Sequence, residues 1–395
     1  MHSTTKPCTL PMPTQARVFD LGGLYARLEQ LVDHRKARGK RYTLALVLLL
    51  VVLAKLCGED HPYGIAQWAR ARAKYLVAAL GLSYLGMPCH NTYRRLLRSV
   101  EPSALQQVVK GFFTARGQGN RRVLIAIDGK TLRGTIPRGQ SQGVHLLAAF
   151  LPHEGLVLMQ VAVDGKENEI SAAPRLLECL DLRDKVVVGD AMLSQRDLSI
   201  QIVEAGGHYI WLAKDNQPHV RQAIADLFEM PTCVLARDQA QAFPSVAVSN
   251  KGHGRQEERI LIASELLNDY LKWPYLGQVF RLERRFIDNG DGSVHAEVVY
   301  GLTDLRQSEA TPAELLKFVR DYWGIENGLH YRRDKTLHED ATRMKHPQQA
   351  AVMATINNLV IGLATRAGWR YLPEARRYYC GNLDEALGLI LCSPG

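Results

Sequence analysis

The sequence predicts an α/β protein in which a mixed sheet follows an all-helical N-terminal domain. Three observations predict this class. Residues 20–116 show a helical pattern of apolar residues, residues 123–214 alternate between short apolar runs and helical patterns, and two of the apolar runs end in an aspartate. With 395 residues the chain is too long for one ordinary domain, so we expect two or three.

The two aspartates follow apolar runs of the same design. Val123–Ile127 is wholly apolar and is followed by Asp128 and a glycine, and Val186–Val188 is followed by a glycine and Asp190. Such runs are typical of strands buried on both faces. We therefore expect Asp128 where the chain leaves the sheet and reaches water, at the end where open α/β sheets hold their ligands. Two buried strands that each end in an aspartate indicate a paired-carboxylate, two-metal site.

The N-terminal region consists of a flexible tail at 1–19 and the helical domain at 20–116. The basic cluster 33–41 is either a contact to a DNA backbone or a solvated linker. In a second cluster, Asn91 can cap a short helix. This helix is either the recognition helix of a helix-turn-helix or an ordinary surface face. Its exposed side would carry Arg94, Arg95 and Arg98.

Residues 117–217 predict the first part of a catalytic core. The expected strands are 123–128, 144–151, 156–163, 186–190 and 208–214, with helices at 169–180 and from 194 to 206. This order of strand, strand, strand, helix, strand, helix, strand is that of a ribonuclease-H-like fold, whose sheet centre carries acidic residues. Residues 218–308 are mostly strand-like and predict a β-rich insertion, with a hairpin turn at 288–292.

Residues 309–370 predict the final helices of the core, and 371–395 are expected to form a C-terminal tail. Thr311 and Glu314 form a capping box. Glu326 then falls on the same face as Leu315, Val319, Tyr322 and Leu329, which places a carboxylate on an apolar stripe. A buried carboxylate requires a partner.

Two kinds of partner are open for Glu326. One is an ion pair with a neighbouring basic residue: His330, Arg332 or Arg333. The other is a metal shared with Asp128 and Asp190, which we favour when the three carboxylates are considered together. Glu339 and Asp340 are a rival acidic pair, ranked second because they lie off the apolar stripe.

Composition narrows the class of partner. The net charge of +9 and pI of about 9.2 favour a polyanion, above all nucleic acid. The seven cysteines are scattered without a C-x-x-C pair, which favours a reducing cytoplasm and argues against a zinc module or a disulfide scaffold. We expect no secretory signal, because the N-terminus lacks a charged stretch that leads directly into an apolar core. We expect no membrane partner, because the apolar run 44–56 is too short to span a bilayer and predicts a buried helix.

Taken together, these segments resemble the DDE transposases of bacterial insertion sequences, in the family that includes the H-repeat-associated proteins. The resemblance follows the family order over almost the whole chain. The strings around Asp128 and Glu326 are the most specific. The matching segments are 125–134, 166–170, 189–192, 214–217, 253–255, 322–330 and 338–340.

The resemblance implies an activity and a set of roles. Asp128, Asp190 and Glu326 would be the catalytic triad and would bind two Mg²⁺ ions, for which Mn²⁺ would substitute. The enzyme would cleave double-stranded DNA at terminal inverted repeats and join the 3′-hydroxyl ends to target DNA. We expect a homodimer in the bacterial cytoplasm, associated with the nucleoid. Two alternatives remain, namely a domesticated DNA-binding protein without catalysis and a structure-specific nuclease.

Basic residues near these segments are candidate phosphate contacts. Each is equally compatible with an ordinary surface charge. Besides the three arginines of the second basic cluster, they are Lys130, Arg133, Lys214, His330 and Arg333.

Overall fold

The computed structural model describes residues 23–36, 40–84, 86–114, 122–165, 167–229, 242–252, 255–288, 293–342 and 344–392. Several predicted features lie outside the described residues. They are the tail 1–19, positions 37–39 of the basic cluster, Lys166, residues 253–254 and positions 289–292 of the predicted hairpin turn.

Six helices precede the first strand in the described part of the chain. Helix α2 is buried along its whole length, as its unbroken apolar sequence predicts. Its one charged residue, Lys55, is fully buried and pairs with Asp60 at 3.0 Å. None of the described helices combines the length and the apolar character needed to cross a membrane. The six are α1 (Leu24–Leu28), α2 (Leu44–Leu56), α3 (Pro62–Ala71), α4 (Ala73–Leu80), α5 (His90–Ser99) and α6 (Pro102–Thr114).

A single mixed sheet forms the centre of the molecule. Its order is β3-β2-β1-β4-β5-β9-β8-β7-β6. Strands β1, β4 and β5 run parallel to one another, and β2 and β3 continue from β1 as an antiparallel meander. The first five strands are β1 (Val123–Leu132), β2 (Val144–Leu151), β3 (Leu156–Val163), β4 (Lys185–Gly189) and β5 (His208–Ala213).

The strands predicted as a β-rich insertion extend this same sheet. Strand β9 pairs antiparallel with β5, from Ile210 opposite Thr303 to Ala213 opposite Tyr300. Strands β8, β7 and β6 follow, each antiparallel to its neighbour. The four strands are β6 (Ser245–Gly252), β7 (Arg255–Ser264), β8 (Gln278–Asp288) and β9 (Val294–Thr303), with α9 (Pro218–Glu229) and α11 (Asn268–Leu271) beside them.

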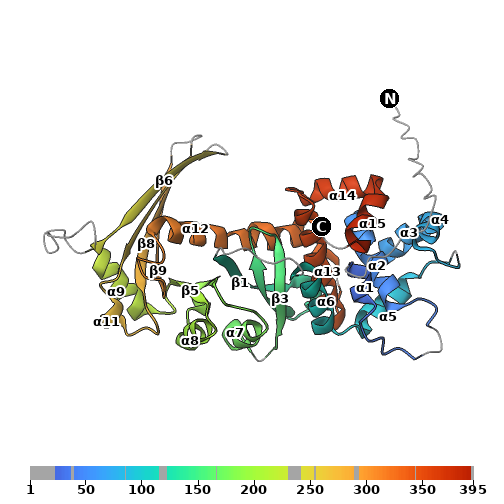
Figure 1. Ribbon diagram of the computed structural model, residues 1–395, viewed down its shortest axis with the longest axis horizontal. Coiled ribbons are helices and arrows are strands. Elements are labelled where there is room, and N and C mark those ends of the chain that lie inside the picture. The colour runs from blue at the N-terminus through green and yellow to red at the C-terminus, as the bar shows by residue number, and fades with distance from the viewer. Residues whose placement is uncertain are drawn as a thin grey trace.

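Helices cover both faces of the first five strands (Figure 1). Helices α7 (Glu169–Glu178) and α8 (Arg196–Glu204) lie on one face, and α12 (Pro312–Tyr322) crosses the other face against β1 and β4. Helix α12 begins with the predicted capping box, in which Thr311 and Glu314 bond to each other's backbone N–H. Helix α8 begins at Arg196, two residues later than its sequence pattern indicates.

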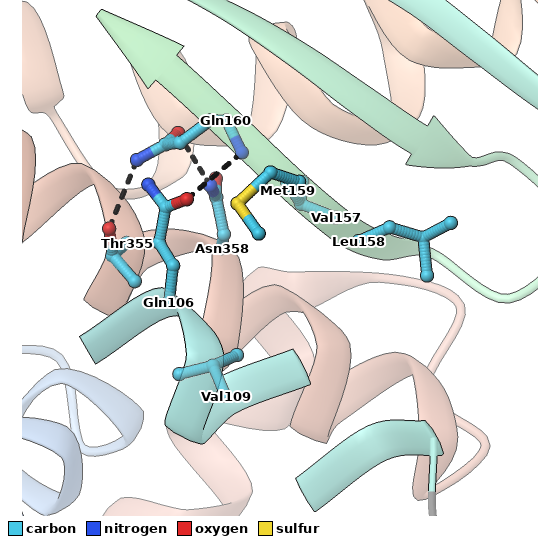
Figure 2. Close-up of a pocket in the computed structure, with 8 residues that line it drawn as sticks. All are labelled: Gln106, Val109, Val157, Leu158, Met159, Gln160, Thr355 and Asn358. Carbon is cyan, nitrogen blue, oxygen red and sulfur yellow. Dashed lines mark hydrogen bonds between the residues drawn. The ribbon is translucent and has the colours of Figure 1, made fainter. Parts of the chain in front are cut away.

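A buried polar network joins the N-terminal helices to the sheet (Figure 2). The backbone N–H of Gln160 on β3 donates to the side chain of Gln106 on α6 at 3.1 Å. The Gln160 side chain donates to Thr355 at 3.0 Å and accepts from Asn358 at 2.9 Å, both on α13 (Pro347–Arg366). Because all four residues are buried, these bonds fix the relative position of α6, β3 and α13.

The segment expected to be a C-terminal tail contains two helices, α14 (Leu372–Gly381) and α15 (Leu383–Leu391). Both contact α2, and their apolar positions are buried. Arg376 of α14 is buried as well and donates to Asp60 at 2.9 Å. Residues 372–391 are therefore part of the N-terminal helical core in space, although they lie at the other end of the sequence.

Candidate carboxylate site

The two strand aspartates are neighbours. In the parallel pair of β1 and β4, Ile127 lies opposite Gly189, so the next residues, Asp128 and Asp190, stand side by side. The absence of a side chain at Gly189 gives room to its neighbours, because a Cβ at this position would lie 2.9 Å from the Leu193 side chain and 3.1 Å from the Trp211 ring. Adjacent strands are about 4.8 Å apart, which brings both carboxylates to one end of the parallel strands.

The environment of Asp128 differs from the expected strand end. Strand β1 continues through Leu132, and Asp128 still pairs with Ala148 of β2. The opening lies on the other side, because β4 ends at Gly189 and leaves that edge of β1 without a partner. Asp128 is thus half-buried within a strand, at the point where its parallel neighbour stops.

Glu326 reaches the same site from α12, but it is exposed and does not lie on the buried stripe. The α-helix ends at Tyr322, and the chain continues in two π-helical turns, Glu326–His330 and Arg332–Thr336. The wider π turns shift the positions that face the core. Leu329 remains buried while Glu326 turns outward, so the expectation of a buried carboxylate was wrong.

Three potential metal ligands converge at this point. One ligand atom each of Asp128, Glu326 and His330 lie within 4.8 Å of one another. The His330 Nε2 and Asp128 Oδ2 atoms are 3.1 Å apart. Carboxylate oxygens suit a hard divalent cation such as Mg²⁺, and a histidine bonded to a carboxylate ligand commonly fixes its orientation. The residues present therefore fit a divalent metal.

Asp190 lies beside this group but points to other partners. It accepts hydrogen bonds from the Lys214 Nζ at 3.1 Å and from the Ala191 backbone N–H at 2.7 Å. The phenol of Tyr322 is buried close to several of these carboxylates. Burial raises the pKa of this phenol, and four nearby negative charges raise it further: Asp128, Asp190, Glu169 and Glu326.

Glu169 is a further carboxylate near Tyr322 and was not among the predicted site residues. It is the first residue of α7 and accepts a hydrogen bond from His145 Nε2 at 2.8 Å, and the other ring nitrogen of His145 lies 2.8 Å from Thr131 Oγ1. A Cβ on Gly129 would lie 2.0 Å from Glu169 Oε1, so this carboxylate sits against β1 on the face opposite to the Asp128 side chain. Of the neighbouring residues, Glu167 pairs with Arg175 and Asn168 caps α7.

The rival acidic pair is engaged elsewhere. Glu339 is buried, accepts from Arg333 at 2.8–2.9 Å and from Asn357 at 2.8 Å. Asp340 accepts from the backbone N–H of Arg133 at 2.9 Å, and its pKa is raised, chiefly by burial. These bonds leave Glu339 unavailable as a third ligand.

The candidate phosphate contacts fall into different environments. Arg333 is fully buried against Glu339. It has no surface for a phosphate, so the predicted DNA contact at this residue is wrong. Lys130 pairs with Asp334 at 2.5 Å and is mostly covered, and Lys214 pairs with Asp190. The three predicted arginines of α5 are all exposed: Arg94, Arg95 and Arg98.

Comparison with known families identifies the class of protein. Residues 119–363 match the model described as Transposase DDE domain, and residues 25–113 match the model described as DDE_Tnp_1-associated. The chain therefore belongs to the DDE transposase family, and the resemblance inferred from its motifs is confirmed.

Individual relatives cover most of the chain. The protein YbfL of Escherichia coli (strain K12) is 28% identical over 88% of this chain and 91% of its own length. The H repeat-associated protein YhhI of the same strain is 27% identical with the same coverage. An uncharacterized protein encoded in the dhlA 3′ region of Xanthobacter autotrophicus is 31% identical over 67% of this chain and 89% of its own.

A solved structure also resembles this fold. It is the cryo-EM structure of a piggyBac transposase synaptic complex with hairpin DNA, with a TM-score of 0.42 and 9% sequence identity. The match covers 93% of this chain and 77% of that one.

Proposed function

We propose that this protein is a metal-dependent transposase that cleaves DNA at the ends of a mobile element and joins the 3′-hydroxyl ends to target DNA. The observation that carries the proposal is the convergence of Asp128 and Glu326 within 4.8 Å, with Asp190 next to Asp128 in register. The three carboxylates are 62 and 136 residues apart along the chain (190 − 128 and 326 − 190). The fold brings them together.

We also propose that strands β1 to β5 form a ribonuclease-H-like core. The support is the order β3-β2-β1-β4-β5, with an antiparallel meander on one side of β1 and two parallel strands on the other. Helix α7 connects β3 to β4, and α8 connects β4 to β5. In this arrangement Asp128 and Asp190 are at the central strand pair, which helices cover on both faces.

The roles of the residues follow from their contacts. Asp128, Asp190 and Glu326 would hold two Mg²⁺ ions, which when bound stabilise charge on the attacking and leaving oxygens of a phosphodiester. His330 orients the Asp128 carboxylate through its 3.1 Å contact. Lys214 balances the charge of Asp190, and it is exposed enough to contact a phosphate when a cation takes that place.

Holding two DNA ends requires two such sites, and we propose that the active form is a homodimer. Each protomer contributes one carboxylate site, since the described residues of a single chain provide one cluster of this kind. A DNA-dependent doubling of mass in solution is the expected observation.

A strand-cleavage and strand-transfer assay tests the function. The substrate is a duplex that carries the DNA sequences flanking the gene, with Mg²⁺, Mn²⁺ or EDTA present. We expect cutting and joining with either metal and neither with EDTA. The variants Asp128→Asn, Asp190→Asn and Glu326→Gln should each be inactive, and Glu178→Gln, an exposed carboxylate of α7 outside the site, should retain activity.

Two results would contradict the proposal. Cutting of branched DNA without joining would assign a structure-specific nuclease, and binding without metal-stimulated cutting would assign a non-catalytic DNA-binding protein. Full activity of any one triad variant would remove that residue from the site.

A further inference from the structure

A second site-like feature lies between the N-terminal helices and the start of α13. It is a groove of about 560 Å³ that is lined by the beginning of α3, one face of α5 and the segment that leads into α13. Its lining is rich in basic and titratable side chains and contains no carboxylate. The residues that matter for its chemistry are His61, His90, Arg94, Arg98, Lys345 and His346.

The cations of this groove have no acidic partner. Arg94, Arg98 and Lys345 are exposed, and among the described residues none of them lies within ion-pair distance of a carboxylate. Arg98 instead donates from Nε to the side chain of Gln349 on α13 at 3.2 Å, which holds its guanidinium at the wall between the two helices. Three uncompensated positive charges around one cavity favour an anionic ligand.

Helix starts add to this positive potential. Helices α3, α5 and α13 all begin at the groove, and the N-cap residues His61 and His346 form no side-chain cap bond. The first turn of a helix has N–H groups without an intrahelical acceptor and carries a partial positive charge. The α3 start is partly compensated, because the Glu59 carboxylate lies against Gly64. The α5 and α13 starts therefore contribute most.

The start of α5 favours negative charge on the thiol in its cap position. Hydrogen bonds from the Thr92 hydroxyl, and then from the backbone N–H groups of Thr92 and Asn91, lower the pKa of the Cys89 thiol. The helix begins at His90 with Cys89 in the cap position, so the predicted Asn91 cap was wrong.

The shape of the groove indicates which anion fits. The rings of Tyr63 and His90 meet edge to face at 62°, so they leave no parallel slot in which a base could stack. The cations are long, exposed side chains that come from two segments, α5 and the residues before α13. Spaced charges along an open groove are suited to consecutive phosphates of a nucleic-acid backbone.

We infer that this groove binds the sugar–phosphate backbone of duplex DNA, with Arg94, Arg98 and Lys345 as the contacts. The inference rests on the proposed function and adds to it the place where DNA is held away from the carboxylates. It also assigns Arg94 and Arg98 of α5 a role that does not depend on DNA sequence. Arg95 stands next to Arg94 on the same helix but does not line the groove, and bonds only to the Asn91 carbonyl, so it provides a matched control.

The test measures DNA binding in EDTA, so that catalysis does not enter. The full-length chain is titrated onto two unrelated fluorescent 30-base-pair duplexes over a range of KCl concentrations. We expect Arg94→Ala and Lys345→Ala each to weaken binding about tenfold on both duplexes and to reduce the slope of log K against log salt by about 1. Arg95→Ala, which removes the same charge, should change affinity less than about twofold. Circular dichroism melting of each variant shows that the fold is retained.

Each other outcome overturns the inference. Equal losses for Arg94→Ala and Arg95→Ala would assign the effect to general charge, and a loss confined to one duplex would assign base recognition. Displacement of the duplex by inorganic phosphate, beyond that by chloride at the same ionic strength, would assign the groove to a free anion. If the wild type binds DNA and the variants Arg94→Ala and Arg95→Ala lose equal affinity, only the inference about the groove is contradicted. If the wild type does not bind DNA at all, the proposed function is contradicted too.

Discussion

The carboxylate site and the basic groove are opposites in charge and in how their charges are compensated. At and near the carboxylate site, three acids have partners from the protein, whereas Glu326 is exposed: Asp128 has His330, Asp190 has Lys214 and Glu169 has His145. In the groove, the cations Arg94 and Lys345 have no charged partner among the described residues. Carboxylates that lie close together need such partners in the folded protein before a metal ion binds. An exposed cation is instead stabilised by water.

This difference indicates a division of labour. The groove can accept DNA without any change in the protein, because its cations are free. The carboxylate site has to exchange a protein cation for a metal ion or phosphate, which makes its occupancy dependent on metal. Binding and chemistry should therefore be separable by mutation, and the following predictions test that separation.

The largest expected effect is a double dissociation between the two regions. Asp190→Asn should lower the cleavage rate at saturating DNA by more than about a thousandfold, the scale on which loss of a catalytic group acts, and leave the Kd for duplex DNA in EDTA within about twofold. Arg94→Ala should do the reverse, weakening the Kd while the cleavage rate at saturating DNA stays near that of the wild type. Cleavage rates and anisotropy titrations measure both quantities. If both variants lose both properties, the regions are not independent.

The second prediction concerns the connection between the regions. Gln160 is buried and bonds to α6 and α13 together, so Gln160→Ala should leave Gln106, Thr355 and Asn358 short of partners. We expect the free energy of unfolding to fall by about 2–3 kcal/mol, measured as a lower urea midpoint. Gln222→Ala, at an exposed position of α9, is the control and should be close to neutral. A shift no larger than the control would show that the network does not hold the two parts together.

A smaller effect is expected at Glu169, which lies on the opposite face of β1 from the Asp128 side chain. Its contact with His145 and its place against Gly129 should hold the backbone of β1 beside Asp128. Glu169→Gln should reduce the cleavage rate about 10–100-fold and raise the Mg²⁺ concentration needed for half-maximal rate. Glu167→Gln, which removes a surface ion pair two residues earlier, should affect neither. An unchanged metal requirement in Glu169→Gln would limit this residue to a structural role.

The sequence predicted the carboxylate site better than the groove, for a physical reason. Asp128 and Asp190 each follow a run of apolar residues, and parallel strands place such positions together whatever the rest of the fold. Glu326 was singled out by its spacing on a predicted apolar stripe and then by the resemblance, but its exposure was not predicted, because a π-helical turn alters the side that a residue faces and leaves no simple periodic signal.

The groove depends on contacts that no local pattern records. Its walls come from α3, α5 and the residues before α13, and their meeting is decided by packing of α13 against α5. Arg94 and Arg95 are equivalent in the sequence, and only the fold separates the one that lines the groove. Likewise, Arg333 was a candidate contact by its charge, whereas its burial against Glu339 follows from tertiary structure.

The smallest expected effect concerns the other basic cluster, whose described residues include Arg35 and Lys40. Hydrogen bonds from the Arg35 guanidinium lower the pKa of Asp33 to about 2, so this pair stays charged above about pH 4, and Lys40 lies 3.7 Å from the same carboxylate. Because Asp33 already neutralises Arg35, Arg35→Ala should weaken duplex binding less than about twofold at neutral pH. Asp33→Asn should tighten it slightly by leaving both cations uncompensated. If Arg35→Ala instead costs as much as Arg94→Ala, the DNA path includes this cluster, and the contrast between compensated and free cations no longer predicts where DNA binds.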